Sequence, residues 1–312
     1  MSDSFRNACR DLRRFAVLRS GRIAGNGVVS AWMLLILLAN GCLGISSNQL
    51  LSNLEDKDWR VRVSAAEELG RRKEAKAVAP LIASLRNEDA DVVAAAGKAL
   101  VMIGQPAVPG LITAMKGDLF CFATEPDIAG ASKVLAMMGK GASGPVIAAL
   151  KHDDYRIRAN AAKVLGETGD PQAVEPLCAA AKDEIWRVRV NARWALEKIG
   201  KPSVDALLAM LHSSAPMDRE SAAMALGRIK DARAIPAFRT ALKEDPAVLV
   251  RVSAAWALGE LRDRDSMDLL ISVLNEKNGL VKAGSLCAMR KIAGRDLGDD
   301  PEVWQKWRKD HP

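Results

Sequence analysis

The sequence has few aromatic residues and few of the side chains that most often carry out catalysis. Aromatic residues make up 4% of the 312 residues, and the only histidines are His152, His212 and His311. Runs of alternating apolar and polar residues rich in β-branched side chains, the usual signal of β-strands, are also missing. Apolar residues nevertheless account for 49% of the chain, and alanine is abundant. This composition predicts an all-α protein.

Motifs for catalysis and metal binding are absent from the sequence as well. The three histidines have no carboxylate or cysteine at ligand spacing, and the patterns Gly-x-x-x-x-Gly-Lys-Ser/Thr, Gly-x-Ser-x-Gly and His-Glu-x-x-His do not occur. The five cysteines include no Cys-x-x-Cys pair, so the sequence predicts neither a zinc site nor a disulfide framework. We therefore expect no enzymatic activity and no cofactor.

The formal net charge of +7 is concentrated at the start of the chain. Phosphate-backbone binding depends on clustered, unbalanced positive charge. The remainder is nearly neutral, because residues 1–42 combine two aspartates, Asp3 and Asp11, with six arginines: Arg6, Arg10, Arg13, Arg14, Arg19 and Arg22. We therefore do not expect a nucleic-acid partner.

Residues 1–42 have the pattern of a targeting segment. The basic start leads into the apolar run from Ala31 to Ala39, which is shorter than a comfortable membrane span. Ala39-Asn40-Gly41-Cys42 resembles a lipobox, the cleavage site of bacterial lipoproteins. The resemblance implies that Cys42 becomes the lipidated N-terminus; an uncleaved signal anchor and a buried structural helix are the alternatives. With either anchor, positive charge stays in the cytoplasm and the body lies outside the cytoplasmic membrane.

After a short linker, residues 43–50, the chain repeats itself at intervals of 30 to 35 residues. Each repeat carries an anchor, a leucine or methionine inside an alanine-rich stretch. A proline follows most anchors by about ten residues and marks the start of another helix, as at Pro80, Pro109, Pro145, Pro176 and Pro236. Each repeat is thus predicted to be a helical hairpin, helix A then helix B, and stacked hairpins over 51–298 form a superhelix with a continuous core. The anchors are Leu69, Leu100, Leu135, Leu165, Leu196, Leu226, Leu258 and Met289.

The repeated residues resemble a known family. The segments Arg60 to Gly70, Arg156 to Gly166 and Arg251 to Gly259 are similar to the short HEAT-like repeats named after phycobilisome lyases. This resemblance implies an α-solenoid of eight repeats, in which the tail 299–312, with Trp304 and Trp307, seals the last repeat. The lyases attach bilins to light-harvesting proteins, so a bilin-lyase-like enzyme or accessory subunit is the alternative to a binding scaffold. Fold does not imply function, and no residue here marks a bilin site.

A basic residue stands seven positions before most anchors, as at Arg62, Arg158 and Arg219. We interpret this series as a structural ladder, in which each side chain reaches the acidic turn of a neighbouring repeat. A binding ladder is the alternative. Arg187, beside Trp186, is expected to lie nearer the surface and is a candidate for partner binding.

Two further features are candidates for partner binding. The third repeat is longer and carries Phe120 and Phe122, which form either a binding loop or an apolar flap over the adjacent helix. The position two before the anchor changes from charged in the first four repeats to apolar in the last four. These four, Trp194, Met224, Trp256 and Cys287, are predicted to line a concave groove that grips a protein or peptide. Alternatively, the tryptophans fill gaps between helices of successive repeats.

Overall fold

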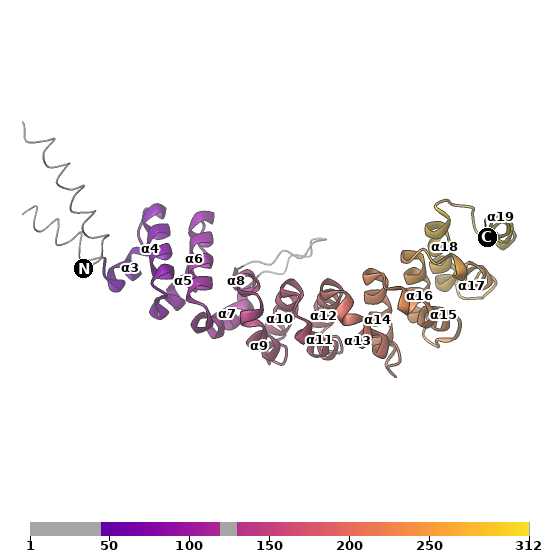
Figure 1. The fold of residues 1–312 in the computed structure, drawn as a ribbon, viewed down its shortest axis with the longest axis horizontal. Coiled ribbons are helices and arrows are strands. Elements are labelled where there is room, and N and C mark those ends of the chain that lie inside the picture. Colours follow the sequence, from indigo (N-terminus) through magenta and orange to yellow (C-terminus); the bar gives the residue numbers. More distant parts are fainter. Residues whose placement is uncertain (1–44, 119–129, 312) are drawn as a thin grey trace, which may run out of the picture. The chain divides into compact units, whose positions relative to one another are not determined.

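The computed structural model describes residues 45–118 and 130–311 (Figure 1). Across these residues the chain forms α-helices and short 3-10 helices and no strand, which confirms the all-α prediction. The chain divides into two compact units, Met1–Leu50 and Leu51–Pro312. The second unit holds the repeats from Leu51 onward.

Each repeat consists of a shorter A helix followed by a longer B helix. The A helices are α3 (Ser47–Asn53), α5 (Val78–Ser84), α7 (Val108–Ala114), α9 (Lys140–Ala149), α11 (Val174–Ala180), α13 (Val204–Met210), α15 (Ile235–Glu244) and α17 (Met267–Val273). The B helices are α4 (Trp59–Arg71), α6 (Ala90–Ile103), α8 (Gly130–Met138), α10 (Tyr155–Thr168), α12 (Trp186–Ile199), α14 (Pro216–Ile229), α16 (Val248–Glu260) and α18 (Gly279–Ala293). Helix α19 (Pro301–Asp310) follows the last repeat.

Successive B helices pack against one another, and each from α6 to α18 also packs against the A helix of its own repeat. Figure 1 shows this succession along the second unit. All eight anchors are at most 1% exposed, so the repeat register read from the sequence is confirmed. The helices enclose a continuous apolar core, as a solenoid requires.

Four of the five prolines predicted to start a helix, Pro80, Pro109, Pro176 and Pro236, lie in the first turn of an A helix, where the missing N–H has no intrahelical partner. Pro109 and Pro236 occupy the second position of α7 and α15. Pro145 is an exception, because α9 already begins at Lys140 and the proline lies inside the helix. The prediction that Pro145 starts a helix is therefore wrong. A separate 3-10 turn precedes α5, α7, α11, α13, α15 and α17, whereas here the α-helix runs through that stretch.

Four of the basic residues before the anchors join neighbouring repeats, namely Arg62, Arg158, Arg219 and Arg251. Arg189 instead donates to the carbonyls of Asp183 and Glu184 in the turn of its own repeat, so the prediction that it reaches a neighbouring repeat is wrong. The guanidinium of Arg219 donates to Asp245 of the next repeat at 2.7 and 2.8 Å, and to the carbonyls of Ser213 and Ser214 in its own turn. Arg158 bonds Asp183 of the next repeat in the same way, at 2.7 and 3.0 Å. Each such arginine fixes the turn of one repeat against the turn of the next. The structural ladder is therefore confirmed at these positions.

Helix α19 covers the end of the array, because it packs against α17. Trp304 is fully buried, and its indole Nε1 donates to the carbonyl of Gly298 at 3.0 Å. The ring of Trp307 meets the ring of Trp304 edge-on, with centroids 6.3 Å apart. The two tryptophans thus cover the A helix of the last repeat with apolar surface.

Among the described residues, no single helix combines the length and the apolar character of a membrane span. Helix α6 and the segment Gln105–Gly117 are long and apolar enough for a membrane span only when they are taken together, and the angle between them is 116°.

Candidate functional site

The four residues predicted to bind a partner lie at one register on four consecutive B helices. Trp194, Met224, Trp256 and Cys287 stand two residues before the anchors of α12, α14, α16 and α18, and these helices pack side by side. The first three side chains are half-buried and Cys287 is exposed. We call these four residues the Trp row.

The two tryptophans each lie against a glycine of the preceding B helix. A methyl group at Gly166 would come within 2.9 Å of Cζ3 of Trp194, and one at Gly227 within 2.6 Å of Cζ3 of Trp256. Each ring also has a cation over it at 5.2 Å, the ammonium of Lys198 over Trp194 and the guanidinium of Arg228 over Trp256. The rings therefore fill part of the space between successive B helices and keep part of their surface accessible.

The contact between α12 and α14 differs from its neighbours because Glu197 occupies the position where the other closely packed helices have glycine. One terminal nitrogen of Arg193 lies 2.8 Å from the sulfur of Met224, and its Nε lies 3.6 Å from Glu197. Burial raises the pKa of Glu197, while the charges of Arg193 and Arg228 oppose the shift. The larger side chains leave these two helices with a less extensive contact than α10 and α12 have.

The structure adds a second row of apolar side chains that the sequence analysis missed. Met217, Leu249 and Leu280 stand nine residues before their anchors and are 52%, 56% and 62% exposed. They lie seven residues, about two helical turns, before members of the Trp row, so both rows share one side of each helix. The same heptad spacing is visible in the sequence. We call these three residues the Leu row.

The two rows on α14, α16 and α18 together form one surface, which we call the apolar face.

The first four repeats carry charged residues at the register of the Trp row. Glu67, Lys98 and Lys133 are exposed, as expected for charged side chains, whereas Lys163 is only 6% exposed. The change from charged to apolar residues at this register therefore follows three exposed charged side chains and one buried lysine.

The predicted binding residue Arg187 is half-buried, with its guanidinium 5.5 Å from the ring centroid of Trp186. Trp186 is 51% exposed, and Val190, one turn further along α12, is 40% exposed. Helix α12, which carries Trp194 of the Trp row, thus has two further exposed apolar side chains, with a cation beside one of them.

Three predicted site residues, Cys42, Phe120 and Phe122, lie outside the described residues. The residues on either side of this undescribed stretch of the third repeat contact each other. The carboxylate of Asp118 accepts hydrogen bonds from the backbone N–H groups of Ala131 at 3.3 Å and Ser132 at 2.8 Å. Burial raises the pKa of Asp118, and the hydrogen bonds from Ser132 and Ala131 oppose this shift.

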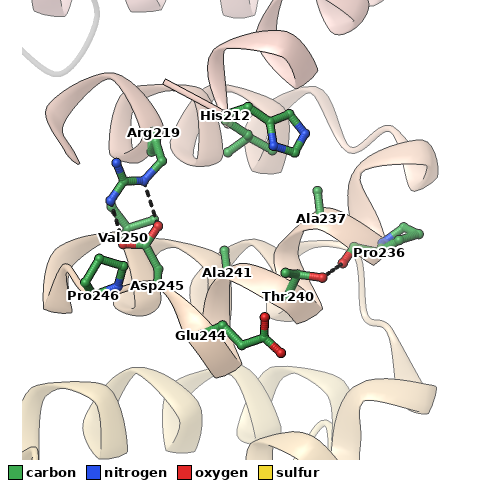
Figure 2. A pocket seen from close by; sticks show the side chains of 11 residues that line it. His212, Arg219, Pro236, Ala237, Thr240, Ala241, Glu244, Asp245, Pro246 and Val250 are labelled. Carbon is green, nitrogen blue, oxygen red and sulfur yellow. Dashed lines mark hydrogen bonds and ion pairs between the residues drawn. The ribbon is translucent and has the colours of Figure 1, made fainter. Parts of the chain in front are cut away.

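A cavity of about 620 Å³ lies between the turn after α13, helices α14 and α15 and the start of α16, and Figure 2 shows its lining with Arg219 and Asp245 at one side. His212, Thr240 and Glu244 also line it. A similar space of about 360 Å³ recurs between the first two repeats, where Arg62 takes the place of Arg219. The cavity is therefore part of the repeat architecture. Within the described part of the chain, no three or more His, Cys, Asp or Glu side chains are grouped to hold a metal ion.

The fold and the repeated contacts define a class, the all-α solenoids. The sequence profile of HEAT repeats matches residues 47–119, 144–216 and 204–290, and the chain belongs to the HEAT-repeat family. None of the curated proteins compared with this chain matches it in sequence.

Several solved structures are similar to the chain. Human deoxyhypusine hydroxylase has 19% identity and a TM-score of 0.35, over 86% of this chain and 92% of the other. The CpcE–CpcF complex of phycocyanin lyase from Nostoc sp. PCC7120 has 20% identity and a TM-score of 0.31, over 86% and 94%. Importin beta has 16% identity and a TM-score of 0.44, over 79% of this chain and 41% of the other. At such identities the likeness concerns the fold alone.

Proposed function

We propose that this chain is a non-enzymatic scaffold or adaptor of the bacterial cell envelope that binds a protein or peptide on the apolar face. The observation that supports the proposal is the exposure of Met217, Leu249 and Leu280 at one register of three adjacent helices. Single exposed apolar residues are common on protein surfaces, but a contiguous set usually marks an interaction site. Tryptophan and methionine beside them suit a binding surface, because their large, adaptable side chains dominate interface energies.

The location in the envelope rests on the sequence of residues 1–42. Their basic and then apolar character, followed by Cys42, supports a lipid anchor on a bacterial lipoprotein. Mass spectrometry of the membrane-extracted protein tests this part of the proposal, since an unmodified tryptic peptide running through Gly41-Cys42-Leu43 would contradict it.

The binding role is tested by placing a photo-crosslinking amino acid on the full chain in its native cells. A probe at Leu249 or Leu280 is expected to trap a discrete protein, because both positions point away from the core. The matched control is Asp91, which has the same register on α6 and is also exposed. Equal labelling from Asp91 and Leu249, or no adduct from either, would contradict the proposed site.

The alternative, a bilin-lyase-like enzyme or accessory subunit, stays a prediction from the repeat resemblance. No contact or cavity among the described residues favours it over binding, since the cavity beside Arg219 recurs in another repeat pair.

A further inference from the structure

We propose that the segment bound on the apolar face is an amphipathic α-helix with acidic side chains along one flank, lying across α14, α16 and α18. This inference rests on the proposed function, protein binding at this face, and adds the shape and charge of the partner.

The spacing of the apolar side chains is the first argument. On each of the three helices the Leu row and the Trp row lie seven residues apart, which is about 10 Å at 1.5 Å per residue. Neighbouring helices pack about 8 to 10 Å apart. The apolar face is therefore a grid of two rows by three helices, with a step of about 10 Å in both directions.

This grid fits an α-helix better than an extended chain. A helix that crosses the three B helices meets a new one every seven residues or so, which is the period of an amphipathic helix with apolar residues at i, i+3 or i+4, and i+7. Its diameter of about 10 Å lets it contact both rows at once. An extended strand advances about 10 Å in three residues, so its successive contacts alternate between opposite faces. A polyproline segment presents every third side chain on the same face, but it is so narrow that it would contact only one row.

The charges beside the Trp row are the second argument. Lys198, Arg228 and Lys291 stand two residues after their anchors, one turn beyond the Trp row, and all three are exposed. On α16 this register is occupied by Glu260, which is held by two lysines, Lys230 at 3.5 Å and Lys291. Lys198 pairs with Glu167 of α10 at 3.6 Å, so the unbalanced charge lies on Arg228 and Lys291. This border carries excess positive charge.

A positively charged border attracts acidic side chains and disfavours basic ones. The partner helix is therefore acidic on the flank nearest the C-terminal ends of the B helices. The same argument disfavours the chain's own residues 1–42 as the occupant, because that segment carries six arginines against two aspartates.

Three labelled peptides of about 21 residues, or three heptads, test the assignment by fluorescence anisotropy with the full chain. The first has leucine at the apolar heptad positions and glutamate along one flank; the second has lysine in place of glutamate; the third is a scrambled version of the first. The acidic peptide is expected to bind saturably, at least about tenfold more tightly than the basic one, and less tightly at high salt. The scrambled peptide is expected to bind at least about tenfold more weakly as well.

Variants of the chain locate the binding. Leu280→Ser is expected to weaken binding of the acidic peptide about tenfold or more. Met102→Ser, at a 42% exposed residue in the first half of the array, is expected to leave that binding unchanged. Arg228→Glu is expected to shift preference toward the basic peptide. Melting curves of all three variants check that the array stays folded, and Lys198→Glu replaces Arg228→Glu if that variant melts early.

Equal binding of the acidic and basic peptides, or of the scrambled peptide, would overturn the assignment. So would tighter binding of a proline-rich peptide, or self-association of the chain that depends on Leu280. If photo-crosslinking at Leu249 traps a protein while the acidic peptide fails to bind, the partner chemistry is wrong and the binding role stands. If neither occurs, both are wrong.

Discussion

At the scale of single residues, the position after each anchor sets how closely successive B helices approach. Gly70, Gly166, Gly227 and Gly259 occupy it where the helices are closest, and each faces an alanine of the next repeat. Glycine is required there by space, because a side chain would meet backbone atoms of the neighbouring helix.

This packing predicts the effect of Gly227→Ala. The added methyl group would lie 2.6 Å from Cζ3 of Trp256 and 3.1 Å from Cα of Ala257, so α14 and α16 must move apart. We expect a loss of about 1–3 kcal/mol in the free energy of unfolding, measured by chemical denaturation. The control is Gly144→Ala in α9, where nothing lies within 4 Å of the new methyl group. That change is expected to be neutral or to stabilise the chain by up to about 1 kcal/mol; a larger loss from the control would contradict the packing argument.

At the scale of helices, the last A helix of the array has to be covered by something other than a further repeat. Every internal A helix is flanked by repeats on both sides, whereas α17 has no further repeat and is covered by α19. Terminal elements of this kind protect the last repeat of a solenoid from solvent.

Trp304→Ala tests the cap. The ring is fully buried, so its removal is expected to cost about 3–5 kcal/mol. Because contacts in repeat arrays are local, faster hydrogen exchange is expected in α17 and α18 and not in α10. Val303→Ala, beside it and 43% exposed, should change the stability by no more than about 0.5 kcal/mol. Uniformly faster exchange along the whole chain would show that the cap acts globally instead.

At the scale of the whole molecule, the arginine ladder couples stability to pH. Burial alone would raise the pKa of Asp183, but the hydrogen bonds from Arg158 and the backbone of Ile185 lower it below the ordinary value of 3.8. Burial would also raise the pKa of Asp245, but the hydrogen bonds from Arg219 and from the backbone N–H of Ala247 lower that pKa. A carboxyl group whose pKa is lowered on folding stabilises the folded state above its unfolded pKa and loses that effect as the pH falls through the folded value.

We therefore expect the melting temperature to fall as the pH is lowered from about 5 to about 2. Asp183→Asn should lower the melting temperature at pH 7 by several degrees and weaken its dependence on acid. Glu184→Gln is the control, because its side chain is 84% exposed and 4.0 Å from Arg158. If Asp183→Asn melts like the unchanged chain at pH 7, the ladder does not stabilise the array.

The sequence by itself determined the parts of this protein that repeat. The eight anchors, the hairpin of each repeat and the ladder from Arg62 onward follow from a period that any alignment of the chain with itself reveals. Such features depend on contacts between residues close in sequence or one repeat apart, and in a solenoid these are nearly all the contacts there are.

Only the tertiary structure decided the features that depend on how one repeat differs from the next. Burial of Lys163, the tryptophan rings over Gly166 and Gly227, and the exposure of Leu249 and Leu280 are set by the distance between particular neighbouring helices. The sequence pattern is the same whether an apolar residue at a given register is buried against the next helix or exposed to solvent. Whether it does one or the other depends on the size of the side chain facing it across the helix contact, and that neighbour stands about thirty residues away.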